Sequence, residues 1–250
     1  MKFENRVAII TGSGSGIGEG VAKRLSQLGV KVVVNDVETE KVNRVVEEIK
    51  ASGGDAIGIA ADITKMDSVR NMFEEIINKY GKIDILINNA GIARDKSMKK
   101  LTEEDWDAVL NVNLKAQFLC CKVALEYMQE QKYGRIVNIS SRAWLGWPGQ
   151  ANYSASKGGV VSLTRTLALE VGRKGITVNC IAPGIIETPL WSTLPDNVRE
   201  RLLESQPTGK IGQPDDIANT VAFFAGDQAG YITGQTIFVC GGKSLFAKMG

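Results

Sequence analysis

The chain has 250 residues, a formal net charge of +2, and 44% hydrophobic residues. This length suits one α/β domain or at most two small ones, and the near-neutral charge gives no reason to expect nucleic acid or a membrane surface as the main partner. The chain contains no histidine, which excludes Ser-His-Asp hydrolysis, HExxH zinc chemistry and any histidine general base. Acid–base chemistry must therefore come from Tyr, Lys, Asp, Glu or Cys.

The cysteines and the N-terminal segment bear on the cellular compartment. Cysteines at 120, 121, 180 and 240 lack CxxC spacing, which indicates buried thiols in a reducing compartment instead of disulfides or a metal site. The N-terminal residues run directly into a strand-like segment, and no apolar run approaches the ~20 residues that span a bilayer. We therefore expect a cytoplasmic protein without a metal or a membrane partner.

Short β-branched runs alternate with amphipathic stretches along the whole chain. In chain order, strands are expected at 7–11, 30–35, 56–60, 83–88, 135–140, 177–182 and 235–239, and helices at 18–28, 38–52, 67–80, 102–131, 153–173 and 214–226. This alternation predicts an α/β fold: one Rossmann-type domain over 1–250, with a doubly wound, mainly seven-stranded parallel sheet and helices on both faces. Only 183–212 is long and irregular, and we expect it to be a substrate lid.

A glycine-rich turn, TGSGSGIG, follows the first strand and opens the first helix. Its spacing is TGxxxGxG and not GxGxxG, but its glycines still let backbone N–H groups approach a pyrophosphate at a helix N-terminus. Asp36 ends the second strand, where a carboxylate accepts the ribose hydroxyls and repels a 2′-phosphate. NAD is therefore favoured over NADP. Asp62 follows the third strand and suits the adenine amino group. For both aspartates, capping the next helix is the competing interpretation.

Tyr153 and Lys157 are expected one turn apart on the same helix face. A nearby ammonium, worth roughly 4 kcal/mol at ~4 Å, would lower the pKa of a tyrosine towards neutrality. Tyr153 would then exchange protons with an alcohol or ketone, while a serine hydroxyl held the substrate oxygen. The pair Ser140-Ser141 ends the preceding strand. A YxxxK spacing alone is common by chance, and its position after this strand strengthens it.

The motifs TGxxxGIG, NNAG, NxSS, YxxxK, Pro183-Gly184 and the terminal GQ…GG occur in one order over essentially the whole chain. In this the chain resembles the short-chain dehydrogenase/reductase family. The resemblance implies that Tyr153 is the acid/base, Lys157 its electrostatic partner and a ribose ligand, and Asn113 the proton-relay asparagine. It also implies that Thr188 holds the nicotinamide carboxamide. The residues expected to contact the cofactor are Gly12, Ser15, Gly16, Ile17, Gly18, Asp36, Asp62, Ile63, Asn89, Ala90, Gly91, Tyr153, Lys157, Pro183, Gly184, Ile186 and Thr188.

The catalytic serine has two candidates. The usual family spacing, thirteen residues before the tyrosine, points to Ser140. Counting along the strand from Gly134-Arg135 points to Ser141. Strand register decides which side chain faces the substrate, whereas a loop tolerates a deletion. We therefore predict Ser141, with one residue lost from 142–149.

The segments NNAGIARD and GQANY most resemble 3-oxoacyl-acyl-carrier-protein reductases and their acyl-CoA relatives. In those enzymes basic residues steer a phosphopantetheine-bearing partner, and Arg94, Lys132 and Arg173 hold comparable positions here, although an ordinary basic surface explains them equally well. Because Asp36 favours NAD, the leading hypothesis is oxidation of a 3-hydroxyacyl-CoA. Tryptophans at the site suggest that the acyl group bears a ring, with plain packing as the alternative for at least one of them. They are Trp144, Trp147 and Trp191.

Two rival functions stay open. One is a free secondary-alcohol or hydroxysteroid-type dehydrogenase, and the other is a non-catalytic NAD-binding subunit of a hetero-oligomer. The resemblance also implies an oligomer, with a tetramer favoured, whose interface is formed by 102–131 and 153–173. Whether its subunits are identical is undecided, and the tail 243–250 is either frayed or reaches a neighbouring pocket.

Overall fold

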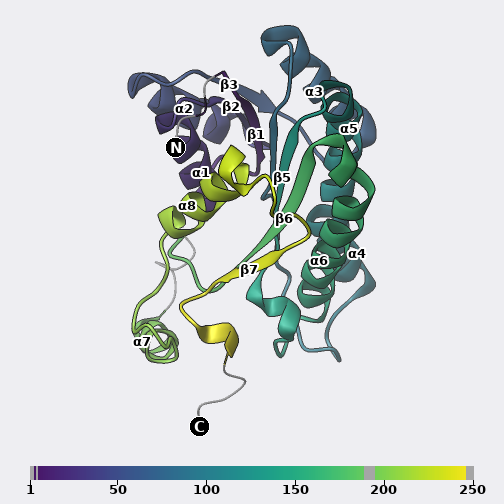
Figure 1. Ribbon diagram of the computed structural model, residues 1–250. Helices are drawn as coiled ribbons and strands as arrows, with labels where there is room; N and C mark the ends of the chain where they lie inside the picture. The colour runs from purple at the N-terminus through teal and green to yellow at the C-terminus, as the bar shows by residue number, and fades with distance from the viewer. Residues whose placement is uncertain (1–2, 4, 189–194, 246–250) are drawn as a thin grey trace.

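The computed structural model describes residues 3, 5–188 and 195–245 (Figure 1). Within them, seven strands form one parallel sheet in the order β3-β2-β1-β4-β5-β6-β7. The strands are β1 (Val7–Thr11), β2 (Lys31–Asp36), β3 (Ala56–Ala60), β4 (Ile85–Asn88), β5 (Gly134–Ile139), β6 (Ile176–Pro183) and β7 (Thr236–Val239). Every residue of β1, β4, β5 and β6 is buried, as expected for central strands covered on both faces.

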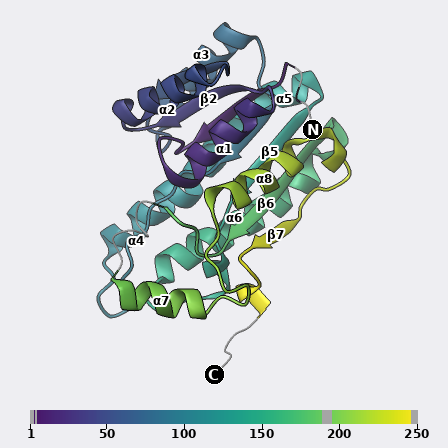
Figure 2. The same cartoon turned by 90° about the vertical axis from the view of Figure 1, so that its left-hand side faces the viewer.

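Helices cover both faces of the sheet (Figures 1 and 2). They are α1 (Gly16–Gln27), α2 (Thr39–Ala51), α3 (Met66–Tyr80), α4 (Glu103–Leu110), α5 (Ala116–Gln131), α6 (Ala151–Val171), α7 (Asp196–Glu204) and α8 (Pro214–Ala225). One apolar core joins the sheet to α1, α2 and α8, and a second joins it to α3, α5 and α6. The predicted doubly wound α/β architecture is confirmed, with each expected strand and helix present.

The structure departs from the sequence prediction in the segment 183–212. We expected it to be irregular throughout, and this was wrong, because Asp196–Glu204 forms α7. None of its residues is buried, so its sequence lacks the apolar periodicity that marks the other helices. Leu202 of α7 and Ser205, the C-cap of this helix, line a cavity described below.

The predicted helix 102–131 is interrupted. A π-helical turn, η1 (Asn111–Lys115), joins α4 to α5. By length and composition alone, the stretch Glu103–Gln131 is long and apolar enough to cross a membrane. The search of the sequence for uninterrupted apolar runs did not detect this stretch. However, 56% of its most apolar window is buried inside the protein, and the core helix of a soluble protein passes the same test.

The parallel arrangement brings the carboxyl ends of the strands to one edge of the sheet. The glycine loop follows β1, Asp36 ends β2, Asn89 follows β4, and Ser140 follows β5. Chain order reverses between β1 and β4. A crevice outside the carboxyl ends at such a reversal is the usual ligand site of an open α/β sheet.

Candidate active site

The glycine loop packs closely against the turn after β4. Gly12 has φ +63°, and a Cβ built on it would lie 2.7 Å from Ala90 Cα. A Cβ on Gly18 would lie 2.4 Å from the Gly12 carbonyl oxygen. Ser15 is the N-cap of α1, but its side chain makes no capping hydrogen bond. The amides of the first turn are therefore left for another acceptor, as a pyrophosphate at a helix N-terminus requires.

A cavity of about 400 Å³ opens beside this loop. It is lined by most of the residues expected to contact the cofactor. These are Gly12, Ser15, Ile17, Asp36, Asp62, Ile63, Asn89, Ala90, Gly91 and Thr188. The lining and the tight glycine contacts together fit a dinucleotide. Gly16 and Gly18 shape the loop and do not line this cavity.

Asp36 braces the loop as well as lining the cavity. Its Oδ2 accepts a hydrogen bond from the Gly14 amide at 3.2 Å, and its Oδ1 accepts bonds from the amides of Val37 at 2.8 Å and Glu38 at 3.3 Å. The last two amides precede the first residue of α2, whose N-cap is Glu38, so Asp36 stabilises the turn before this helix and does not cap it. The carboxylate also lines the cavity, as the ligand role requires.

Two cations lie near Asp36 that the sequence reasoning missed. They are Lys41 and Arg44, which α2 brings back to the glycine loop. Arg44 Nη2 donates to the Gly14 carbonyl at 2.9 Å. Both cations are paired with carboxylates: Lys41 with Glu38, and Arg44 with Glu19 and Glu48.

Asp62 is held by its own turn. Its Oδ1 accepts hydrogen bonds from Thr64 Oγ1 at 2.6 Å and from the Thr64 amide at 3.0 Å. The Thr64 hydroxyl is the main cause that lowers the pKa of Asp62. The carboxylate is therefore kept ionised at the cavity wall by a local turn. Both hydrogen bonds come from Thr64, which precedes Lys65, the N-cap of α3, so Asp62 does not cap that helix.

A second cavity of about 600 Å³ adjoins the first and shares Ile17, Asn89 and Thr188 with it. Tyr153 and Lys157 from the first turns of α6 line it, together with both serines after β5. Pro183 at the end of β6 and Gly184 and Ile186 after it also line this cavity. The structure thus gathers the predicted catalytic residues, apart from Asn113, around one space beside the expected nicotinamide position.

Burial dominates the electrostatics of the Tyr153–Lys157 pair. Lys157 is 3% exposed, and burial lowers its pKa to about 8. Burial raises the pKa of Tyr153, a hydrogen bond with Ser141 lowers it, and the Asp95 carboxylate raises it. We expected Lys157 to lower the pKa of Tyr153, but Lys157 is not among the groups that shift this pKa. The Lys157 ammonium donates to the Ile139 carbonyl at 3.0 Å and lies 5.7 Å from the centroid of the tyrosine ring.

The two serines have different partners. Ser140 is 2% exposed, and its hydroxyl donates to the Lys157 carbonyl at 2.8 Å. Ser141 accepts a hydrogen bond from the Ala143 amide at 3.1 Å and also hydrogen-bonds Tyr153. The first serine therefore braces α6, while the second stands beside the tyrosine. This geometry supports the choice of Ser141 that strand register predicts.

Asn113 lies in the π-helical turn and is fully buried. Its amide donates to the Ile92 carbonyl at 3.0 Å and to Ser156 Oγ at 3.2 Å, and its carbonyl oxygen accepts from the Ile92 amide at 2.8 Å. A Cβ on Gly91 would lie 3.2 Å from Asn113 Oδ1 and 3.4 Å from Lys157 Nζ. Asn113 and Lys157 therefore flank Gly91, and no hydrogen bond joins them. A π-turn at such a position is common at functional sites.

The predicted tryptophan wall is present only in part. Trp147 lines the cavity and is 46% exposed. Trp144 does not line it, because the 3-10 turn η2 (Arg142–Leu145) directs this side chain towards Phe238, on which it stacks at 5.9 Å, and towards Val160. In the structure Trp144 therefore packs as the alternative interpretation supposed, and its substrate role gains no support. Trp191 lies outside the described residues.

The basic residues expected at the pocket mouth are elsewhere. Arg94 pairs with Asp105 at 3.3 Å and does not line the cavity. Lys132 precedes β5 and Arg173 precedes β6. Both therefore lie at the opposite edge of the sheet from Tyr153. Sequence reasoning also missed Arg142, which does line the cavity. Its only signal was its place directly after Ser141.

Comparisons with known proteins place this site in a class. A protein-family model described as enoyl-(acyl carrier protein) reductase matches residues 12–244. The chain belongs to the short-chain dehydrogenase/reductase family, whose members use a nicotinamide cofactor, and it is an oxidoreductase that interconverts secondary alcohols and ketones.

Individual relatives match nearly the full chain. The chain is 53% identical over 247 residues to a protein of Thauera aromatica named (2S)-[(R)-hydroxy(phenyl)methyl]succinyl-CoA dehydrogenase subunit BbsD, with 99% of this chain and all of that one covered. It is 42% identical to the 3-oxoacyl-[acyl-carrier-protein] reductase FabG of Thermotoga maritima, covering 97% and 99% of the two chains. The crystal structure of levodione reductase matches with a TM-score of 0.93 at 34% identity, covering 98% and 99%.

Proposed function

We propose that this protein oxidises a ring-bearing 3-hydroxyacyl-CoA to the 3-oxoacyl-CoA, with NAD as the hydride acceptor. The observation that carries the proposal is the joint placement of Ser141, Tyr153 and Lys157 around one cavity, next to the cleft that Asp36 lines. The relatives support an acyl thioester as the substrate. The name of BbsD describes a secondary alcohol whose carbon bears a phenyl ring, on a CoA thioester, and the name of FabG describes a 3-oxoacyl thioester.

The proposed chemistry follows from the positions of these side chains. The Ser141 hydroxyl donates a hydrogen bond to the substrate oxygen, and Tyr153 accepts the proton of the substrate hydroxyl. NAD supplies the acceptor for the hydride that leaves the same carbon. Because burial raises the pKa of Tyr153, its ionised form needs positive charge nearby. Lys157, with a pKa of about 8, is mostly protonated at neutral pH, and it would supply this charge together with the positively charged ring of oxidised NAD. The proton then leaves past Gly91, which Asn113 and Lys157 flank.

The preference for NAD is part of the proposal. Asp36 presents a carboxylate at the cleft, and the two nearest cations, Lys41 and Arg44, are already bound by glutamates. A 2′-phosphate would therefore meet negative charge without a free positive partner. We expect kcat/KM with NAD to exceed that with NADP by about 100-fold, and Asp36→Asn to narrow this ratio at least tenfold. A wild-type ratio near one would contradict the assignment.

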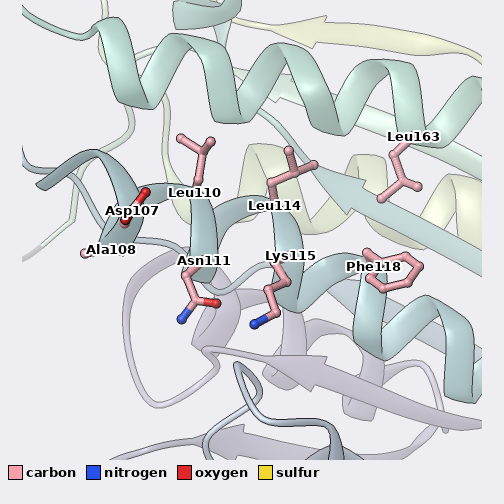
Figure 3. A pocket seen from close by; sticks show the side chains of 8 residues that line it. All are labelled: Asp107, Ala108, Leu110, Asn111, Leu114, Lys115, Phe118 and Leu163. Carbon is pink, nitrogen blue, oxygen red and sulfur yellow. The ribbon is translucent and has the colours of Figure 1, made fainter. Parts of the chain in front are cut away.

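We also propose that the chain works as a subunit of an oligomer, with a tetramer favoured. A largely apolar groove of about 730 Å³ follows α4, η1, α5 and α6 (Figure 3). Its lining residues are Asp107, Ala108, Leu110, Asn111, Leu114, Lys115, Phe118 and Leu163. The exposed Phe118 ring at its end is the best place to test the interface. We expect Phe118→Glu to lower the native mass measured by light scattering, whereas an unchanged mass would argue against this interface.

The substrate class is tested by the reduction of NAD. A CoA thioester of a 3-hydroxy acid, its free acid, simple secondary alcohols and hydroxysteroids are compared with the same purified enzyme. We expect kcat/KM for the thioester to exceed that for the free acid by at least about 100-fold, because binding energy from the CoA part lowers the barrier of the chemical step. Equal values would remove the case for CoA recognition and favour a free-alcohol dehydrogenase. No activity on any alcohol, with NAD still bound, would favour the non-catalytic subunit.

A further inference from the structure

An arginine in the wall of the catalytic cavity lacks an anionic partner. Arg142 follows Ser141 directly, is only partly exposed, and lines the same cavity as Tyr153. Burial lowers its pKa, and Cys240 acts in the opposite direction. Among the residues that the structure describes, no carboxylate pairs with it. By contrast, Arg94 and Arg44, which lie outside this cavity, are both held by carboxylates.

Aromatic and basic groups surround Arg142. Its guanidinium carbon lies 4.9 Å from the centroid of the Trp147 ring. Lys243, in the 3-10 turn η6 (Lys243–Leu245), lines the same cavity. The carboxylate of Asp95 also lines it, and its Oδ2 accepts a hydrogen bond from Gln150 Nε2 at 2.6 Å. Among the lining residues that the structure describes, Arg142, Lys243 and Lys157 outnumber the single carboxylate, so the cavity favours an anionic ligand.

We infer that Arg142, assisted by Lys243, binds a carboxylate on the acyl part of the substrate, so that the substrate is the CoA monothioester of a dicarboxylic acid. This inference rests on the proposed function and specifies its substrate. A planar guanidinium matches a carboxylate bidentately, and its partial burial strengthens the pair. Trp147 fixes one face of the guanidinium by stacking and gives the substrate ring an apolar neighbour.

A CoA thioester also carries anions in its phosphates. The position of Arg142 next to Ser141 distinguishes the proposed carboxylate from these phosphates. Ser141 is the residue that we place at the reacting oxygen, and Arg142 is its immediate neighbour. Both residues also line the same cavity of about 600 Å³, so we place an anion bound by Arg142 on the acyl part, near the carbon that loses the hydride. The phosphates of CoA are separated from that carbon by the whole pantetheine arm. A carboxymethyl group on the carbon next to the carbinol has the required reach.

The experiment pairs two substrates with several variants. One substrate is 2-[hydroxy(phenyl)methyl]succinyl-CoA, and the other carries a methyl group in place of the carboxymethyl group. For wild type we expect kcat/KM to favour the dicarboxylic substrate by about 30-fold or more, the size of a lost hydrogen bond to a charged group. Arg142→Met should lose about this factor on the dicarboxylic substrate and change the methyl analogue by less than about threefold. Arg142→Lys should restore part of the difference, and Lys243→Met should give a smaller loss of the same kind.

Matched controls keep the outcomes separate. Arg173→Met removes an arginine at the opposite edge of the sheet and should leave both substrates unaffected. NAD binding and the melting temperature show whether Arg142→Met is folded. An equal loss on both substrates in a folded Arg142→Met protein would assign Arg142 to the CoA phosphates or to structure and overturn the inference. A wild type that oxidises both thioesters equally well would also overturn it while leaving the proposed function intact. Failure to oxidise either thioester would instead contradict the proposed function.

Discussion

Lys157 is buried at the catalytic centre, and its ionisation should make the stability of the protein depend on pH. Burial lowers its pKa from 10.5 to about 8. Between these values the unfolded chain binds a proton at this site that the folded chain has lost, so the free energy of unfolding rises with pH. The charged lysine costs the fold about 3 kcal/mol below pH 8, and about 2.5 kcal/mol of this is recovered between pH 7 and pH 10.

The measurement is denaturant unfolding of wild type and Lys157→Met at each pH. Tyrosines and cysteines titrate in both proteins, so the difference between the two free energies isolates Lys157. Relative to Lys157→Met, wild type should gain about 2.5 kcal/mol as the pH rises from 7 to 10. Lys99→Met, at an exposed position, should follow the wild-type curve. If Lys157→Met also runs parallel to wild type, the lysine does not titrate near pH 8 and the electrostatic reasoning for the site is wrong.

The other substitutions separate chemistry from packing. Ser141→Ala should lower kcat about 100-fold. Ser140→Ala should leave kcat within about threefold and lower the free energy of unfolding in urea by about 1 kcal/mol. The reverse result would identify Ser140 as the catalytic serine. Gly18→Ala should cost about 2 kcal/mol and raise the KM for NAD, since its Cβ would clash with the loop; an unchanged KM would refute that packing. Trp144→Ala should cost about 3 kcal/mol with kcat/KM little changed, whereas Trp147→Ala should affect mainly kcat/KM for ring-bearing substrates. Equal effects of the two tryptophan changes on kcat/KM would contradict their different places.

Local sequence patterns were enough to predict the sheet and most of its helices. Strands buried on both faces are apolar along most of their length. The strands β1, β4, β5 and β6 could therefore be predicted from continuous apolar runs in the sequence. Helix α7 buries no residue and therefore carries no such signal. The residues predicted to be catalytic come together because their spacing is set within one turn or one strand. Ser141 is the clearest case, since the strand register that predicts it agrees with its hydrogen bond to Tyr153.

Features that depend on contacts between distant segments were missed. The rotation of the 3-10 turn η2 decides that Trp144 packs on Phe238 while Arg142 faces the cavity. The sequence alone does not predict these different orientations, because the two residues are nearly adjacent in the chain. Likewise, Lys132 and Arg173 were placed at the pocket by their family positions, whereas chain topology puts them at the far edge of the sheet.

The ion pairs of Lys41 and Arg44 have a consequence for how coenzyme choice could change. Both cations already stand beside the glycine loop, but Glu38, Glu19 and Glu48 neutralise them. Acceptance of a 2′-phosphate would therefore not require a new basic residue. Removing the Asp36 carboxylate together with one of the glutamates that hold Arg44 would release positive charge that is already in position. In this protein, negative charge is thus what discriminates between the two coenzymes. Substitutions that only remove carboxylates would be enough to change the preference from NAD to NADP.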